Sequence, residues 1–368
     1  MYKHGIDCIE KADYILADKR VGLITNYTAL NSKFKRTADI LFDRYNLVRL
    51  YAPEHGLNGI YQDGINVDDM TDEITGLAVY SLFKESFSID LEGIDVVAYD
   101  IQDLNLRFYT HTSFMALAMK ECSSKNIPFV IFDRYNPLGL EEMSGTVLDE
   151  KYSSLCGMYS VPSRYGLTVG EYAKYINDEK NIDCELHVIP CSGLNRTDTF
   201  LTLNIPWINP SPNIPTFDTA FVYAGTVLFE GTNVSEGRGT TKPFEFIGAP
   251  WINSEELASV MNSKNLPGVH FRPVSFVPVS SKYSGECCNG VQLHITDYNA
   301  FEPFSCGLYL LDVIRKTCSE FNFTDFLKNL LGNDDFENAD FDVELYIEHH
   351  KNKISDFGKK AQKYYLYK

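Results

Sequence analysis

The sequence lacks the features that mark several common classes of protein. Its nine cysteines include no C-x-x-C pair, which fits neither a zinc ribbon nor a disulfide framework. No apolar run is long enough to cross a membrane, and the first residues, MYKHGIDCIEKADYIL, have no basic segment followed by an apolar one. We therefore expect no membrane partner and a cytoplasmic protein with reduced thiols, or a secreted one if an export signal has been removed.

Positive charge is also scarce. Lysine and arginine total 33 against 50 acidic residues, which gives a net charge of -17. An acidic chain repels polyanions unless a local basic stripe compensates, and the sequence shows no such stripe, so we expect no nucleic-acid partner. With 368 residues, 44% of them hydrophobic, the chain is long enough for two packed subdomains.

Nucleotide-binding and metal-binding motifs are missing as well. The first apolar run is followed by NYTAL rather than by G-x-G-x-x-G, and Gly237 is followed by Arg238, Gly239 and Thr240 rather than by a P-loop lysine and hydroxyl. No H-x-x-x-H or H-x-H pair occurs. The sequence therefore predicts neither a cofactor nor a metal site.

Short apolar runs alternate with helix-like segments in the first half of the chain. This alternation predicts an α/β fold with a doubly wound, mainly parallel sheet. Thr168 and Glu171 have capping-box spacing at the start of one helix. The predicted strands are 21–26, 47–54, 94–103, 127–134 and 185–191, and the predicted helices are 113–126 and 167–180.

The amino-acid composition of the sequence changes near residue 205. The segment IPWINPSPNIPT (205–216) is rich in proline and reads as a rigid crossing between subdomains. We expect an α/β subdomain over residues 1–205 and a smaller α+β subdomain over residues 206–368. In the second subdomain we expect helices at 219–229 and 254–264 and strands at 269–279 and 290–297.

Polar side chains follow four of the predicted strands. Open parallel sheets bind ligands outside the carboxyl ends of their strands, so these side chains should line one functional edge. They are Asn26 and Tyr27; Glu54 and His55; Asp100, Gln102, Asp103 and Arg107; and Asp133, Arg134 and Asn136.

Two segments at this edge each allow two interpretations. In APEHGLNG (52–59), Glu54 is either a solvated residue of a turn or a general acid with His55 as its neighbour. In DIQDLNLRFYTHT (100–112), Asp103 and Arg107 either form a structural ion pair or contact a ligand. Neither reading excludes contact between a sugar and Tyr109.

The segment FEGTNVSEGRGTTKPFEFIGAP (229–250) shows neither helical nor strand periodicity. Its carboxylates, amide, hydroxyls and guanidinium suit a polyhydroxylated, N-acetylated and partly anionic ligand. We expect the two glycines beside Arg238 to leave room for close approach to the ligand. The candidate binding residues here are Glu230, Asn233, Glu236, Arg238 and Thr240.

Together these motifs resemble, in order, those of the NamZ-type exo-β-N-acetylmuramidases, a bacterial family of peptidoglycan glycosidases. The similarity covers roughly residues 20 to 300 and includes FDRYNPLG, RYGLTVGEYA and PGVHFRP. It implies a Rossmann-like subdomain and a smaller one that closes the active-site cleft. It also implies removal of N-acetylmuramic acid from the non-reducing end of peptidoglycan fragments. The partner would be a carbohydrate, either a muropeptide or a fragment of N-acetylmuramic acid linked to N-acetylglucosamine.

The resemblance assigns the acid of the PEHG motif to Glu54 and leaves the second catalytic group open. The candidates for that group are Glu236, Asp100 and Glu230, and the spacing of the two carboxyl groups would distinguish retention from inversion. The lactyl carboxylate of the sugar calls for a bidentate cation, and the candidates for this clamp are Arg238, Arg107, Arg134 and Arg164.

Tyr165 and His111 depart from the family pattern, and the sequence does not tell how they affect the substrate preference. The sequence also allows two alternatives, a muropeptide-binding protein without turnover and a metal-dependent hydrolase. The sequence does not predict the oligomeric state.

Overall fold

The structure is a computed structural model that describes residues 2–84 and 86–368, and the chain divides into two compact units. The first unit comprises Met1–Glu142, Tyr165–Pro212 and Lys359–Lys368, and the second comprises Met143–Arg164 and Asn213–Gly358. The sequence placed one boundary between 205 and 206. In the structure a division lies close by, at 212/213, and the two units also exchange the segments 143–164 and 359–368.

The first unit is built on a seven-stranded sheet with the order β3-β4-β2-β1-β5-β6-β7. The strands are parallel except for β3, which runs antiparallel to β4. The predicted α/β class with a mainly parallel sheet is thus confirmed. The strands are β1 (Arg20–Thr25), β2 (Asn46–Ala52), β3 (Met70–Thr71), β4 (Ala78–Ser81), β5 (Val96–Asp100), β6 (Phe129–Phe132) and β7 (Leu186–Ile189).

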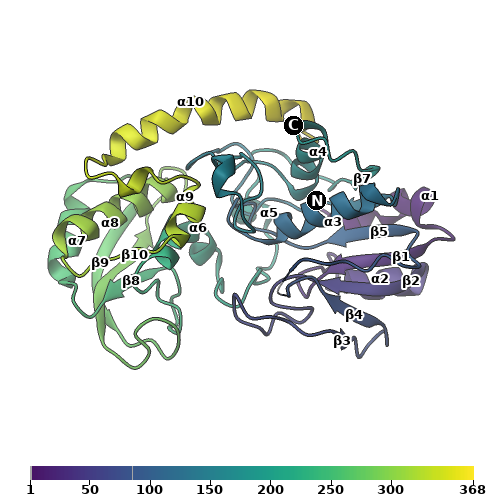
Figure 1. The fold of residues 1–368 in the computed structure, drawn as a ribbon, viewed down its shortest axis with the longest axis horizontal. Helices are drawn as coiled ribbons and strands as arrows, with labels where there is room; N and C mark the ends of the chain where they lie inside the picture. Colours follow the sequence, from purple (N-terminus) through teal and green to yellow (C-terminus); the bar gives the residue numbers. More distant parts are fainter. Residues whose placement is uncertain (1, 85) are drawn as a thin grey trace. The chain divides into compact units, whose positions relative to one another are not determined.

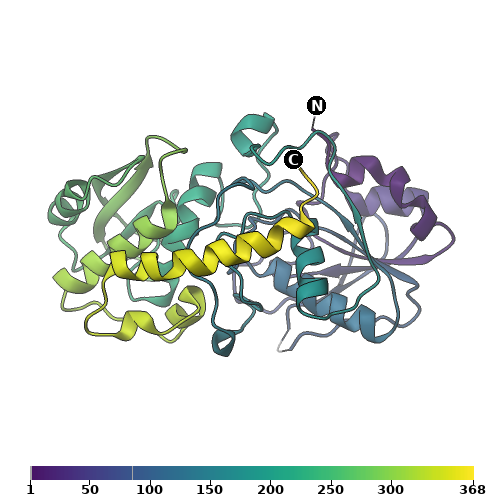
Figure 2. The ribbon, with the colours of Figure 1, turned by 90° about the horizontal axis from the view of Figure 1, so that it is seen from above.

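Helices cover both faces of this sheet. Apolar residues of η1 (Gly5–Ala12), α1 (Asp13–Leu16) and α2 (Thr37–Arg44) form one core with Val21 and Leu23 of β1 and their neighbours on the same face. Tyr99 points to the other face, where its hydroxyl donates to the His111 carbonyl at the start of α3 (His111–Ser124). Figure 2 shows the purple helices η1 and α1 and the blue helix α3 on opposite sides of the strands.

Helix α4 (Val169–Glu179) begins where its sequence predicts. The Thr168 hydroxyl accepts a hydrogen bond from the Glu171 N–H, and the Glu171 carboxylate accepts one from the Thr168 N–H, so the predicted capping box is confirmed. Two short elements complete the unit, α5 (Phe200–Leu203) and η5 (Gln362–Tyr364).

The second unit contains a three-stranded antiparallel sheet in the order β8-β10-β9. Figure 1 shows α7 and α8 beside this sheet. The predicted strands at 269–279 and 290–297 are confirmed as β9 (Val269–Phe276) and β10 (Cys288–Ile295). The other elements are η2 (Glu150–Tyr152), α6 (Phe217–Thr226), η3 (Val227–Gly231), β8 (Phe246–Ala249), α7 (Ser254–Ser263), α8 (Pro303–Thr317), α9 (Phe326–Leu331), η4 (Asp335–Glu337) and α10 (Val343–Ala361).

Candidate active site

Glu54 lies in a tight turn at the carboxyl end of β2. The Gly56 N–H donates to the Pro53 carbonyl at 3.0 Å, and the turn places His55 at φ 71° and Gly56 at φ 73°. A positive φ is uncommon for a residue with a side chain and often marks a functional position. The PEHG sequence therefore forms a turn, as its simpler interpretation predicts, but Glu54 is buried rather than solvated.

The Glu54 carboxylate is bound by two uncharged donors. The Gly64 N–H donates to Oε1 at 2.8 Å, and the Thr110 hydroxyl donates to Oε2 at 2.7 Å. Thr110 lies just before α3, so the carboxyl end of β2 and the loop after β5 meet at this side chain. A hydroxyl can donate to a carboxylate or accept from a carboxylic acid, so the Thr110 contact suits both forms of Glu54.

His55 is fixed beside this carboxylate. Its Nδ1 lies 2.9 Å from the Tyr61 carbonyl, which accepts only if Nδ1 carries the proton. The His55 ring also lies 6.5 Å from that of His111, centroid to centroid. The PEHG turn and the start of α3 thus bring two imidazoles together.

A buried and largely uncharged polar cluster surrounds the loop after β5. Burial raises the pKa of Asp103 to about 8 and lowers the pKa of His111 to about 3, so both side chains are neutral at pH 7. The Asp103 Oδ2 lies 3.9 Å from the His111 Nδ1. The Asp103 Oδ1 accepts from the Asn105 N–H at 2.5 Å, and Asn105 takes a positive φ of 56°.

Several polar atoms of this cluster have no hydrogen-bond partner among the described residues. The residues that carry these atoms are at most 1% exposed. Because nearly all buried polar atoms in proteins are hydrogen-bonded, unpaired ones are unusual. Unpaired atoms gathered at a strand edge indicate a place for a polar ligand. The atoms are the Asp103 Oδ2, the Asn105 Oδ1 and Nδ2, the His111 Nδ1 and the Tyr165 hydroxyl.

Two further residues of this edge are buried beside the cluster. Arg107 is 2% exposed and Tyr109 is 6% exposed. Burial raises the pKa of Tyr109 well above its ordinary value, and the nearby Tyr27, Asp103 and Glu54 add to the increase. Tyr109 therefore lies close to both the cluster and Glu54.

Asp100, a candidate for the second catalytic group, is fully occupied by protein contacts. Its Oδ1 accepts from the Arg134 Nε at 2.5 Å and its Oδ2 from the Arg134 Nη2 at 2.9 Å. The Thr37 hydroxyl also donates to Oδ2, and the side chain is 0% exposed. No part of this carboxylate faces open space, so Asp100 does not suit the role of second catalytic group.

Asp133 and Asn136 hold neighbouring segments of the first unit together. The Asp133 carboxylate accepts bonds from the Thr168 hydroxyl at 2.8 Å, the Gly170 N–H at 2.8 Å and the Tyr367 hydroxyl at 2.6 Å. The Asn136 amide accepts from the N–H of Leu138 and donates to a carbonyl next to the α4 cap. The hydrogen bonds of Asp133 and Asn136 therefore give both residues a structural role in the first unit.

In the second unit, Glu236 lies between two cations. Its Oε1 is 3.2 Å from the Arg238 Nε and its Oε2 is 2.9 Å from the Lys282 Nζ. Arg238 also pairs with Glu230, and its guanidinium lies 5.0 Å from the centre of the Phe244 ring. Glu230, Glu236 and Arg238 therefore form one ion-pair network.

Lys282 stabilises the loop that carries Glu236 through hydrogen bonds to its backbone. Besides the carboxylate, its Nζ donates to the carbonyls of Phe229 at 2.7 Å and Val234 at 3.1 Å. One ammonium group thus binds both ends of the segment 229–234 and the Glu236 carboxylate that follows it.

The glycines beside Arg238 serve the packing of the loop rather than ligand approach. Gly237 and Gly239 have φ values of 76° and 75°. A Cβ on Gly239 would lie 2.6 Å from the backbone of Ser280, so the chain itself fills the space beside this glycine and the predicted room for a ligand is absent there.

The remaining predicted residues of the second unit also contact protein. Asn233 donates to the Glu320 carbonyl and accepts from the Asn322 N–H, both at 2.8 Å. Thr240 donates to the Gly237 carbonyl within its own turn. Arg164 lies over the Phe221 ring at 5.8 Å.

Sequence reasoning missed two residues that shape these groups, Thr110 and Lys282. Thr110 stands between Tyr109 and His111 in a segment already selected, so its position was the available signal. Lys282 lies in the connection between β9 and β10, far along the chain from Glu236, and no motif links the two.

Comparison with known proteins identifies the family. The sequence models of the N-terminal and C-terminal domains of the exo-β-N-acetylmuramidase NamZ match residues 21–218 and 221–367. The chain belongs to the NamZ family. It is 42% identical over 364 residues to the peptidoglycan β-N-acetylmuramidase NamZ of Bacillus subtilis, covering 96% of this chain and 88% of the relative.

Solved structures share the fold of this NamZ family member. Two crystal structures of DUF1343 family proteins from Bacteroides fragilis match with TM-scores of 0.91 and 0.82, at 33% and 27% identity. Each match covers 100% of this chain and 99% of the other. Among the described residues, no helix is long and apolar enough to span a membrane.

Proposed function

We propose that Glu54 is the general acid with which this chain releases N-acetylmuramic acid from the non-reducing end of peptidoglycan fragments. Membership of the NamZ family makes the chain a glycosidase that acts on peptidoglycan. The observation that supports the role of Glu54 is its position, a buried carboxyl at the carboxyl edge of the sheet, bound by the Gly64 N–H and the Thr110 hydroxyl.

Cleavage of a glycosidic bond requires a proton for the departing oxygen. Glu54 supplies it, and the Thr110 hydroxyl donates to the carboxylate that the transfer leaves. The Gly64 N–H can only donate, so its bond is strongest with the carboxylate that remains. The two contacts therefore favour the product state of the proton transfer.

The neutral cluster near Glu54 is suited to the uncharged parts of the sugar. At pH 7 Asp103 carries a proton that it can donate, and the Asn105 amide offers both a donor and an acceptor. Hydroxyl and acetamido groups match this set without leaving a buried charge unpaired. Tyr109 adds an aromatic ring beside the carboxylate.

The second catalytic role requires a nucleophile, a base for water, or the acetamido group of the substrate itself. Glu236 and Glu230 stay predictions for this role. The arginine that binds the lactyl carboxylate also stays a prediction. Two of its four candidates, Arg238 and Arg134, already form ion pairs with carboxylates of the protein.

The decisive experiment is incubation of the protein with a disaccharide of N-acetylmuramic acid linked to N-acetylglucosamine, followed by analysis of the released sugars. We expect both monosaccharides, with the same yield in the presence of a chelator. Binding without release would indicate a muropeptide-binding protein, and activity abolished by the chelator would indicate a metal-dependent hydrolase.

A further inference from the structure

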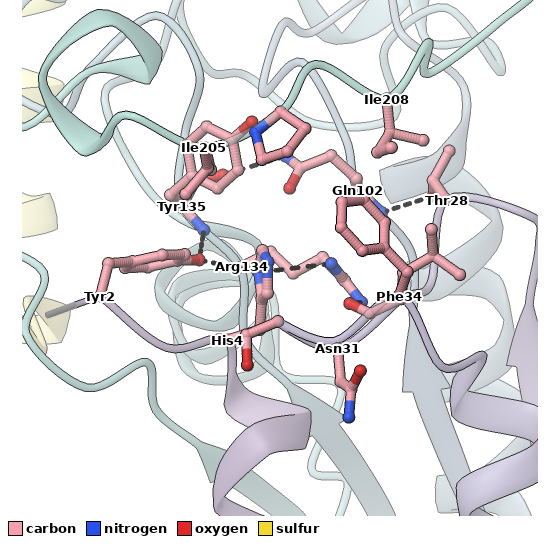
Figure 3. Close-up of a pocket in the computed structure, with 13 residues that line it drawn as sticks. Tyr2, His4, Thr28, Asn31, Phe34, Gln102, Arg134, Tyr135, Ile205 and Ile208 are labelled. Carbon is pink, nitrogen blue, oxygen red and sulfur yellow. Dashed lines mark hydrogen bonds between the residues drawn. The ribbon is translucent and has the colours of Figure 1, made fainter.

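A pocket lies in the first unit, at the carboxyl ends of β1, β5 and β6 (Figure 3). Its volume is about 90 Å³. It borders the point between β1 and β5 where the strand order changes direction, which is where doubly wound sheets bind ligands. The lining residues used below are Leu30, Asn31, Phe34, Gln102, Arg134 and Tyr135.

Gln102 presents one unsatisfied acceptor in this pocket. Its Nε2 donates to the carbonyls of Asp103 at 2.8 Å and Tyr135 at 3.0 Å, which fixes the orientation of the amide. Its Oε1 has no partner among the described residues, although Gln102 is only 6% exposed. A buried acceptor of this kind calls for an N–H or O–H donor from a ligand.

The pocket carries no unbalanced charge. Arg134 is paired through two nitrogens with Asp100, and its Nη2 also donates to the Leu30 carbonyl at 2.9 Å. Burial, with a smaller contribution from Arg134, lowers the pKa of His4 well below its ordinary value, so this imidazole is neutral at pH 7. A neutral ligand is therefore favoured over an anion or a cation.

Phe34 stands at the rim of the pocket in an unusual conformation. It is 58% exposed and takes φ 61°, which is an outlier for a bulky residue. Asn31 maintains this turn, because its carbonyl accepts from the Phe34 N–H and its side-chain oxygen accepts from the N–H groups of Lys33 and Lys35. The turn therefore holds an aromatic ring open to solvent next to the pocket.

We infer that this pocket binds a neutral N-acetylated sugar, whose acetamido N–H donates to the Gln102 Oε1 while its apolar face packs against Phe34 and Tyr135. Figure 3 shows Gln102 between these two aromatic side chains. The inference rests on the proposed function, because N-acetylglucosamine is the neutral sugar that alternates with N-acetylmuramic acid in peptidoglycan. Gln102 also bonds the Asp103 carbonyl, so the pocket adjoins the polar cluster.

The test is direct binding of methyl N-acetyl-β-glucosaminide to the full chain, measured by ligand-observed NMR against methyl β-glucoside. We expect the N-acetylated glycoside to bind about tenfold more tightly, which corresponds to about 1.4 kcal/mol. Phe34→Ala should raise its Kd by a similar factor. Phe42→Ala is the matched control, because Phe42 lies on α2, is 43% exposed and does not line the pocket.

Equal binding of the two glycosides would overturn the acetamido assignment. A Kd unchanged by Phe34→Ala, or no binding of either glycoside at tens of millimolar, would overturn the assignment of the sugar to this pocket. A chromogenic β-N-acetylmuramide without a second sugar is assayed on the same preparation. Failure to hydrolyse it counts against the proposed function, and the glycoside binding still decides this inference.

Discussion

Two buried glutamates, Glu54 in the first unit and Glu236 in the second, are held by opposite kinds of partner. Glu54 accepts hydrogen bonds from a backbone N–H and a hydroxyl, both uncharged. Glu236 lies between the guanidinium of Arg238 and the ammonium of Lys282. Both carboxyl groups stand out in the sequence as members of polar motifs, and only their contacts distinguish them.

The difference between these partners indicates which of the two carboxyl groups is suited to exchange a proton. An uncharged hydroxyl can reverse its hydrogen bond when the carboxyl group gains a proton. Two cations interact well only with the ionised form, so they favour a permanent carboxylate. Glu54 therefore fits a group that changes its protonation during the reaction, and Glu236 fits one that keeps its charge.

The largest effect is expected for Glu54→Gln. The amide is nearly isosteric, so it can keep contacts with Gly64 and Thr110 but cannot protonate the leaving group. We expect kcat on a disaccharide of N-acetylmuramic acid linked to N-acetylglucosamine, whose departing sugar oxygen needs the proton, to fall about 100-fold or more, with KM and the unfolding midpoint little changed. Near wild-type turnover would assign the acid role to another residue.

Glu236→Gln should lower stability instead. Loss of the charge leaves Lys282 and Arg238 without their shared carboxylate, so we expect the free energy of unfolding to fall by about 1.5–3 kcal/mol. Urea titration measures this loss, with Glu54→Gln as the matched control. An additional loss of kcat of about 100-fold in the folded variant would support Glu236 as the second catalytic carboxylate, and unchanged kcat would exclude it.

Asp103→Asn should change how stability depends on pH. The pKa of Asp103 is raised to about 8 in the folded protein, whereas an unfolded aspartate titrates near its ordinary value of about 3.9. Between these values the folded state holds a proton that the unfolded state has lost, so this contribution to stability decreases as pH rises. Its slope is at most about 1.4 kcal/mol per pH unit.

Asparagine keeps an acceptor and a donor at position 103 but does not titrate. The free energy of unfolding of the variant, measured by urea titration between about pH 5 and pH 7.5, should therefore fall less steeply with pH than that of the wild type. Identical slopes would mean that Asp103 is ionised in the folded protein, and the neutral cluster around Glu54 would have to be reconsidered.

The smallest effect concerns Arg238→Ala, for which we expect no difference between the losses of kcat/KM on two substrates. Because Arg238 is engaged by Glu230 and Glu236, Arg238→Ala should reduce kcat/KM equally on muramic acid and N-acetylglucosamine substrates. A loss about 10-fold to 150-fold greater on the muramic acid substrate would instead identify Arg238 as the lactyl clamp, at about 1.5–3 kcal/mol for a charge-assisted contact. Paired kinetics on the two chromogenic sugars measure it.

Much of the first unit could be predicted because its signals are local. Apolar runs gave β1, β2, β5, β6 and β7, and the Thr168–Glu171 capping box marked the start of α4. Parallel strands share one carboxyl edge, so Glu54 and Asp103 could be placed there before any contact was known.

Contacts between distant residues could not be predicted in this way. The Thr110 hydroxyl reaches Glu54 from another strand exit, and Lys282 reaches Glu236 from the connection between β9 and β10. Asp100 and Arg134 each looked like ligand residues until their mutual ion pair was seen. The exchange of 143–164 and 359–368 between the units also leaves no compositional mark in the sequence.

The hydrogen bonds of Tyr367 set an order for folding during synthesis. Its hydroxyl donates to Asp133 and accepts from the Cys191 N–H, so a residue that is made after the whole second unit completes the interior of the first. Every residue of the second unit is made before Lys359. The second unit can therefore finish folding first, although domains usually complete from the N-terminus onward. Until Tyr367 has been made, Asp133 lacks one of its hydrogen-bond donors.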